Sequence, residues 1–195
     1  MDDTRFLALR HAFEQHAPRS AQRYEGAREA AVAMLIRAHE ELEVLLIKRA
    51  EHESDPWSGH MALPGGRRDP TDDDLLHTAM RETREEVGVA VTRDMQLLGA
   101  LDEVSPRNPR LPPIIIAPFA FAVPVDTTPV IDPREVEAAI WVPLPALRDE
   151  SAASEILITL EGGSRSFPSL TYGEYVIWGL THRILLQLLD ITDGL

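Results

Sequence analysis

Apolar residues recur along this chain at two spacings, and each spacing predicts a different kind of element. Short runs rich in Val, Ile and Leu are typical of strands. We predict strands at residues 30–37, 42–49, 95–104, 114–125, 156–160 and 166–172. Apolar residues repeated every three or four positions predict helices instead. We predict helices at residues 4–15, in a segment that ends before Gly88, and at residues 175–189.

The predicted elements favour a mixed α/β fold. The polar turn 39–41 joins the first two strands into a hairpin, and the segment 161–164 joins another pair. Strands and helices do not alternate in repeated βα units, so we expect a mixed sheet with helices on both faces. The 195 residues are expected to form a single domain, residues 1–195, in which residues 1–28 form an N-terminal helix and a connection.

Two glycines and a group of acidic residues stand close together in residues 64–89. The stretch begins with Pro-Gly-Gly and ends in a helix that carries Glu82, Glu85 and Glu86. At about 100° per residue, these glutamates lie on one side of the helix. A separate and mostly apolar stripe consists of Leu76, Ala79, Met80, Thr83 and Val87. We therefore expect one side of this helix to pack and the other to present three carboxylates.

The acidic side of this helix indicates a cation site. Neighbouring carboxylates disfavour one another's ionisation, and a divalent cation removes that penalty. Mg²⁺ takes oxygen ligands, typically a few carboxylates together with the oxygens of a phosphate substrate. The backbone at Gly65 and Gly66 can approach a ligand closely because it carries no side chain. The sequence thus predicts a phosphate site that uses Mg²⁺ or Mn²⁺. The alternative is a solvated helix with ordinary charge pairs.

The composition excludes several other classes of function. The chain has 19 basic and 32 acidic residues and a net charge of −13, which opposes binding to nucleic acid or to an anionic membrane. It has no cysteine, which excludes disulfides, zinc–thiolate sites and thiol catalysis. The N-terminal residues read as neither a signal peptide nor a membrane span. We expect a cytoplasmic protein whose partner is a small molecule.

Residues 65–89 resemble the Nudix box of the Nudix hydrolases. The residues that stand at the positions of the pattern are Arg81, Glu82, Glu85, Glu86, Gly88 and Val89. The interval between glycine and arginine is one residue longer than in the pattern. Its upstream acidic position therefore falls on Asp72 or on Asp73, depending on the direction of counting. The resemblance implies an α/β/α sandwich and a metal-dependent pyrophosphohydrolase.

Residues outside the box resemble the coenzyme A pyrophosphatase subgroup of this family. The upstream signature is matched by Leu45, Leu46, Arg49, Ala50, Gly59 and Pro64, although its second arginine is absent. Residues 135–147 are similar to a subgroup segment in which a Glu-Val pair precedes a strand and a short helix. The subgroup implies cleavage of coenzyme A or acyl-coenzyme A to 3′,5′-ADP and phosphopantetheine. The alternatives are ADP-ribose or another nucleoside diphosphate derivative as substrate, and a nucleotide-binding regulator without hydrolysis.

The resemblance also assigns roles to single residues. Glu82 and Glu86 are the expected metal ligands, with Glu85 as a third ligand or as the group that orients the attacking water. Arg81 is expected to hold a glutamate in place. The Gly65–Gly66 backbone is expected to line the diphosphate site.

Three further residues are candidates for substrate contact, namely Arg49, Trp57 and Arg107. Trp57 is expected either to stack on an adenine ring or to cover the core. Arg107 lies in a proline-rich loop of the kind that often carries ligand contacts. Glu103 and Glu135 are candidates for additional metal ligands, but the sequence favours exposed surface positions for both. A homodimer is a further expectation from the family.

Overall fold

The fold is built on a mixed seven-stranded sheet, seen in a computed structural model that describes residues 3–52, 57–106, 113–160 and 163–194. The strands of this sheet are β1 (Arg28–Ala38), β2 (Leu42–Arg49), β3 (Met61–Ala62), β4 (Gly65–Arg67), β5 (Leu97–Ala100), β6 (Ile114–Ala122) and β7 (Val136–Pro143). Strand β1 runs parallel to β6 and antiparallel to β2 and β4. The expectation of a mixed sheet is confirmed.

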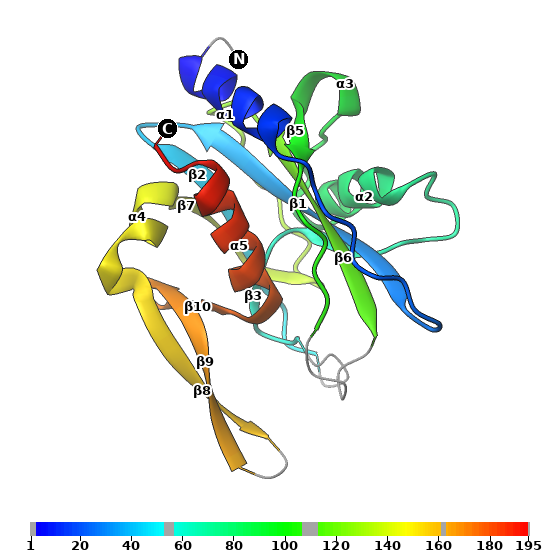
Figure 1. Ribbon diagram of the computed structural model, residues 1–195, viewed down its shortest axis with the longest axis vertical. Coiled ribbons are helices and arrows are strands. Elements are labelled where there is room, and N and C mark those ends of the chain that lie inside the picture. Colours follow the sequence, from blue (N-terminus) through cyan, green and yellow to red (C-terminus); the bar gives the residue numbers. More distant parts are fainter. Residues whose placement is uncertain (1–2, 53–56, 107–112, 161–162, 195) are drawn as a thin grey trace.

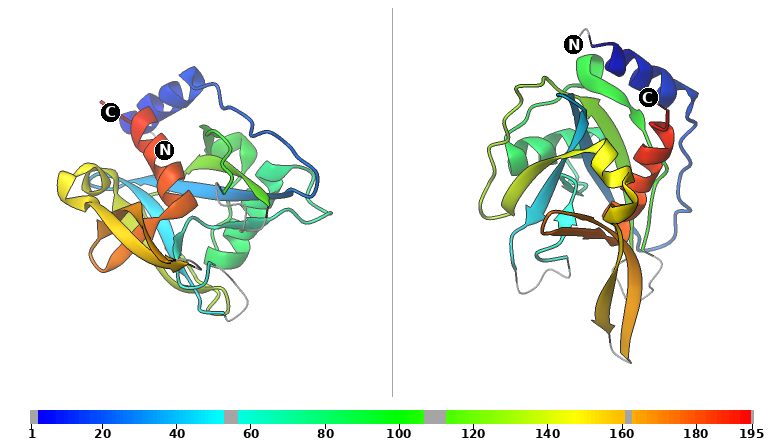
Figure 2. Two further views of the ribbon diagram at one scale, coloured as in Figure 1. Left: turned by 60° about the horizontal axis from the view of Figure 1, so that its bottom comes forward. Right: turned by 90° about the vertical axis from the view of Figure 1, so that its left-hand side faces the viewer.

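Helices cover both faces of this sheet. They are α1 (Thr4–Gln15), α2 (Leu75–Val87), α3 (Arg93–Gln96), α4 (Leu144–Arg148) and α5 (Gly179–Ile191), with a 3₁₀ turn at Glu150–Ala152. Figures 1 and 2 show α1 and α5 on one side of β1 and α2 on the other. Among the residues described, no helix has the length and apolarity that crossing a membrane requires.

The alternation of side chains along β1 explains why both faces are covered. Ala31, Ala33 and Leu35 belong to the apolar cluster that packs beneath α2. Met34 and Ile36, which point the other way, belong to the cluster shared with α1 and α5. Because successive strand residues face opposite sides, an uninterrupted apolar run requires a cover on each side. The predicted α/β/α sandwich is therefore confirmed.

A second, three-stranded sheet lies beside the first. It consists of β8 (Ala153–Leu160), β9 (Gly163–Tyr172) and β10 (Tyr175–Trp178), in the order β10-β9-β8. The hairpin of β8 and β9 extends away from the rest of the molecule (Figure 1). The predicted hairpin over 156–172 is thus confirmed, with longer strands.

Two sequence predictions are wrong in their boundaries. The strand expected at 95–104 is divided, because Arg93–Gln96 forms a helical turn and β5 covers only Leu97–Ala100. The helix expected from Tyr175 begins instead at Gly179. The intervening residues form β10, which turns back onto β9 through Gly173 at φ 59°. Pairing with a neighbouring strand overrides the local helical spacing there.

Candidate metal and diphosphate site

Helix α2 presents the acidic residues in a fixed orientation. The Asp74 side chain caps the start of the helix by accepting a hydrogen bond from the His77 amide at 2.8 Å. Gly88 ends the helix at φ 67°, a left-handed conformation that glycine adopts without strain. The apolar stripe of the helix is buried against the sheet, as predicted, with Ala79 and Val87 fully covered. The opposite side carries the glutamates.

The two box glycines bring β4 into close contact with both β1 and α2. Gly65 pairs with Val32, and a side chain at Gly65 would lie 2.3 Å from the carbonyl oxygen of Ala31. A side chain at Gly66 would lie 2.4 Å from Oε1 of Glu82. Any larger residue would therefore displace the strand or the carboxylate. The glycines allow the backbone of β4 to run directly beside the helix carboxylates.

Three carboxylates converge at this point and form what we call the acid cluster, Glu82, Glu86 and Glu135. One oxygen from each lies within 4.8 Å of the others. Glu86 is only 2% exposed, and its Oε2 accepts a hydrogen bond from the Gly65 amide at 2.8 Å. Nη1 of Arg49 lies 3.9 Å from Oε1 of Glu86. The cluster is therefore fixed by contacts from β2 and β4.

The protonation of the acid cluster reflects its burial. Burial raises the pKa of Glu86 to about 8, against the opposing effect of the Gly65 hydrogen bond, and the charge of Glu82 adds to the rise. Burial also raises the pKa of Glu82. Three converging carboxylates supply the hard oxygen ligands that Mg²⁺ and Mn²⁺ prefer, and a bound dication offsets their repulsion. The donor set fits the predicted cofactor.

The raised pKa of Glu86 predicts how the stability of the metal-free protein depends on pH. Below about pH 4.5 Glu86 is protonated in both states, and between there and about pH 8 only the unfolded state releases the proton. The folded state then binds more protons, so this residue's contribution to the free energy of unfolding falls as pH rises through that window, by at most about 1.4 kcal/mol per pH unit. Urea unfolding across the window should show this slope in the wild type but not in Glu86→Gln. Parallel pH profiles for the two proteins would contradict the prediction.

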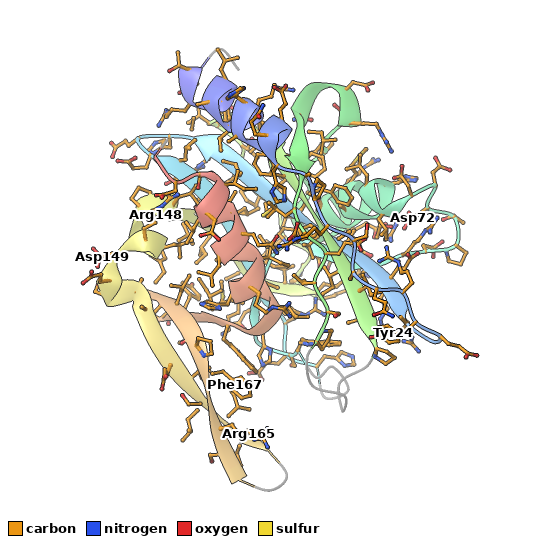
Figure 3. The ribbon with its side chains drawn as sticks, viewed as in Figure 1. Tyr24, Asp72, Arg148, Asp149, Arg165 and Phe167 are labelled. Carbon is orange, nitrogen blue, oxygen red and sulfur yellow. The ribbon has the colours of Figure 1, made fainter. Side chains whose placement is uncertain are left out.

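Arg81 joins the acid cluster to the loop before α2. It donates to both oxygens of Asp72 at 3.0 Å, to Glu82 at 2.9 Å and to Glu85 at 2.8 Å. The Asp72 side chain is 1% exposed, whereas that of Asp73 is 93% exposed. Hydrogen bonds from Arg81 hold the pKa of Asp72 well below its usual range. Asp72 therefore occupies the position that counting along the sequence left open between two residues. Figure 3 labels it beside α2.

Glu85 and Glu103 are not among the three residues of the acid cluster. Glu85 is 55% exposed at its side chain, and its carboxylate pairs with Arg81. Its role as a third metal ligand remains a prediction. Glu103 accepts hydrogen bonds from Arg23 and from the Ala21 amide, which ties the N-terminal connection to the sheet. The Glu103 side chain is only 13% exposed, so the expected exposed position is wrong, because these hydrogen bonds hold the carboxylate against the N-terminal connection.

Glu135, the third member of the acid cluster, is exposed as expected, but its carboxylate converges with those of Glu82 and Glu86. The loop before β7 bonds to the end of α2 through the Asp132 amide and the Glu86 carbonyl, at 3.0 Å. The Glu135 carbonyl accepts from the Ala50 amide at 2.9 Å. These backbone contacts carry an exposed carboxylate from far along the chain to the helix. The Glu-Val pair that begins the segment was the one sequence feature that pointed to it.

Of the predicted substrate contacts, Arg49 and the two glycines lie beside the glutamates, and Trp57 lies on a neighbouring loop. Arg49 and the Gly65–Gly66 backbone lie at the acid cluster. Trp57 is half-buried, and its carbonyl accepts from the His60 amide at 3.2 Å, on the loop that leads into β3. Arg107 lies outside the described residues.

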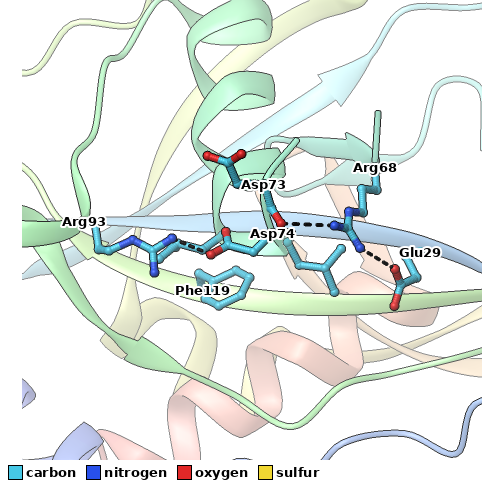
Figure 4. A pocket seen from close by; sticks show the side chains of 8 residues that line it. Glu29, Arg68, Asp73, Asp74, Arg93 and Phe119 are labelled. Atoms are coloured by element: carbon cyan, nitrogen blue, oxygen red, sulfur yellow. Dashed lines mark hydrogen bonds and ion pairs between the residues drawn. The ribbon is translucent and has the colours of Figure 1, made fainter. Parts of the chain in front are cut away.

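A shallow pocket at the start of α2 lies apart from this site. It has a volume of about 550 Å³. Its lining includes Arg68 and Arg93, which pair with Glu29 and Asp74 respectively (Figure 4). The glutamates of the acid cluster do not line it.

Comparisons with known proteins agree with this arrangement. The chain matches the family model described as the NUDIX domain over residues 26–160. It is 30% identical over 161 residues to the uncharacterized Nudix hydrolase NudL of Yersinia pestis, covering 83% of this chain and 78% of that protein. It is 41% identical over 104 residues to the uncharacterized protein C14C4.10c of Schizosaccharomyces pombe. That match covers 52% of this chain but only 32% of the yeast protein.

A solved structure shows the same fold over nearly the whole chain. A MutT/nudix family protein from Enterococcus faecalis aligns with a TM-score of 0.59 at 20% identity, covering 99% of this chain and 70% of that one. The family model spans most of the chain and includes the helix and glycines that build the acid cluster. The chain therefore belongs to the Nudix hydrolase family.

Proposed function

We propose that this protein is a metal-dependent pyrophosphohydrolase that cleaves the diphosphate of a nucleoside diphosphate derivative. The observation that carries the proposal is the acid cluster beside the glycine strand. Three carboxylates within 4.8 Å of one another, one of them almost fully buried, form a site for a dication. The neighbouring backbone at Gly65 and Gly66 leaves room for the oxygens of a diphosphate.

Each residue of the site has a definable task in this reaction. Glu82, Glu86 and Glu135 would hold the ion, which when bound neutralises charge on the diphosphate and lowers the pKa of a water. Arg81 fixes the Glu82 carboxylate through its hydrogen bond. Arg49 places a positive charge beside Glu86, where it can also attract a phosphate oxygen.

Two roles for Glu85 are compatible with the proposal. Its carboxylate is exposed and held by Arg81, at i and i+4 on the same helix. In that position it can orient the attacking water or serve as a further metal ligand. A carboxylate that acts as a base must reach its water directly or through one other water.

Coenzyme A or acyl-coenzyme A is the proposed substrate. The upstream residues Leu45, Leu46, Arg49 and Ala50 support it by their similarity to the coenzyme A pyrophosphatase subgroup. The missing second arginine of that signature favours the alternative of ADP-ribose or another nucleoside diphosphate derivative, because coenzyme A carries an additional 3′-phosphate. A cytoplasmic location stays a prediction from the composition and the N-terminal residues, and a homodimer stays a prediction from the family resemblance.

A product-release assay tests the substrate. The purified protein is incubated with Mg²⁺ or Mn²⁺ and with coenzyme A, acetyl-coenzyme A, ADP-ribose or a dinucleotide, and the products are identified by mass spectrometry. We expect 3′,5′-ADP and phosphopantetheine from coenzyme A. Much faster cleavage of ADP-ribose than of coenzyme A would show that the alternative substrate, ADP-ribose, is the correct one. Nucleotide binding without turnover of any compound would instead identify a regulator.

The affinity for Mn²⁺ tests the part played by Glu135. Glu135→Gln should weaken Mn²⁺ binding by about tenfold or more, since even outer partners of a metal site contribute about 10- to 100-fold. Titration calorimetry or electron paramagnetic resonance measures this without substrate. The matched control is Glu137→Gln, which removes a carboxylate two positions further along the chain that pairs with Lys48 instead. Equal affinities in the two variants would remove Glu135 from the proposed ligand set.

A further inference from the structure

Three aromatic rings from separate segments meet beside the end of β2. The His60 ring lies 4.9 Å from that of Trp178, centroid to centroid, in an edge-to-face arrangement. The ring of Phe167, from β9, lies 5.8 Å from that of Trp178, centroid to centroid. All three side chains are half-buried, so the group retains accessible ring surface. We call these three residues the aromatic platform. Figure 3 shows Phe167 closer to the body of the molecule than Arg165 on the same hairpin.

Arg49 connects the aromatic platform to the acid cluster. Its backbone amide donates to the His60 carbonyl at 3.1 Å, which continues the antiparallel pairing of β2 with β3. Residues opposed in this way place their side chains on the same face of the sheet. Nη1 of Arg49 lies 3.9 Å from Oε1 of Glu86. Arg49 is therefore in contact with both groups, with the aromatic platform through the His60 backbone and with the acid cluster through Glu86 of α2.

We propose that the aromatic platform binds the nucleobase of the substrate whose diphosphate lies at the acid cluster. This inference rests on the proposed function and specifies which part of the substrate the site recognises away from the reacting bond. A nucleoside diphosphate presents a flat base, a ribose and a charged diphosphate in that order. The rings of the platform suit the base, whereas Arg49 and a dication at the acid cluster would suit the diphosphate. Flat aromatic surfaces stack with any base, and purines offer the larger face.

The competing explanation is that the rings only fasten β10 and the β8–β9 hairpin to the body. Such a contact would stabilise the fold, but the affinity for a ligand would not depend on whether the ligand carries a base. The two explanations therefore differ in one measurable quantity, the ratio of affinities for ligands with and without the base.

Adenosine 5′-monophosphate and ribose 5-phosphate differ only in the base and provide this comparison. Titration calorimetry of the wild-type protein should show the nucleotide binding about tenfold more tightly, as expected for one stacked base. Trp178→Leu should remove most of this preference, and Trp178→Phe, which keeps a ring, should retain most of it. His60→Ala provides a second variant that leaves the hairpin unchanged. Circular dichroism and thermal unfolding establish whether each variant is folded.

The outcomes separate this inference from the proposed function. Equal wild-type affinities for the two ligands would overturn the platform as a base site, whether or not the variants fold. A preference that survives in both Trp178→Leu and His60→Ala would place the base elsewhere and also overturn it. A protein that prefers the nucleotide through these rings but hydrolyses no diphosphate would retain the platform while refuting the proposed hydrolysis. Hydrolysis of the diphosphate without a preference for the nucleotide would support the proposed function and refute the platform as a base site.

Discussion

Glu86→Gln is expected to lower turnover by about two to three orders of magnitude while leaving the fold intact. The substitution keeps the size of the side chain and an oxygen that can accept from the Gly65 amide. It removes the negative charge that this carboxylate, which is 2% exposed and belongs to the acid cluster, would carry with an ion bound. Because that charge would hold the ion that neutralises the diphosphate, its loss acts mainly on the transition state.

Steady-state kinetics with the best substrate from the release assay, together with circular dichroism, measure this effect. Glu14→Gln, which alters an exposed glutamate on α1, is the control and should behave as the wild type. Glu85→Gln adds a comparison within α2. A loss close to that of Glu86→Gln would support a direct role for Glu85, and a small loss would leave it as a partner of Arg81. Near wild-type turnover in Glu86→Gln would refute the assignment of the site.

Asp72→Asn is expected to destabilise the protein by about 2 to 3 kcal/mol, whereas Asp73→Asn should change stability by no more than about 0.5 kcal/mol. Asp72 is buried, and its two oxygens accept from Arg81, the Thr78 hydroxyl and the Asp69 amide. An amide in its place turns one acceptor into a donor that faces other donors. Asp73 is 93% exposed at its side chain, so the same change there is solvated.

Equilibrium unfolding in urea, followed by circular dichroism at neutral pH, compares these two neighbouring substitutions. The pair is matched in residue type and in position along the chain, so the difference in midpoint reports the environment alone. Asp72→Asn should also reduce turnover, because Arg81 then loses one of the partners that fix its position beside Glu82. Equal stabilities for the two variants would show that the Arg81 network contributes little to the fold.

Local patterning was sufficient for the elements whose faces are determined by nearby residues. Helix α1 and strand β2 have the bounds expected from the spacing of their apolar residues, Thr4–Gln15 and Leu42–Arg49. Helix α2 buries the predicted stripe and ends at Gly88. The fold class followed as well, because apolar runs without repeated βα units require a sheet covered on both sides. Similarity along the chain pointed to the Nudix hydrolase family, which the family model confirms.

Local patterning and motif similarity were thus enough to assign the helix that carries the glutamates, the glycines beside it and the family. The tertiary structure decided which carboxylates meet. Glu135 converges with Glu82 and Glu86 only in the folded chain. Likewise, only the folded chain shows that Asp72, and not the exposed Asp73, pairs with Arg81. The reason is physical. Periodicity records which side of an element a residue occupies, whereas the meeting of residues far apart in sequence depends on how backbone hydrogen bonds align separate segments, here the loop before β7 against the end of α2.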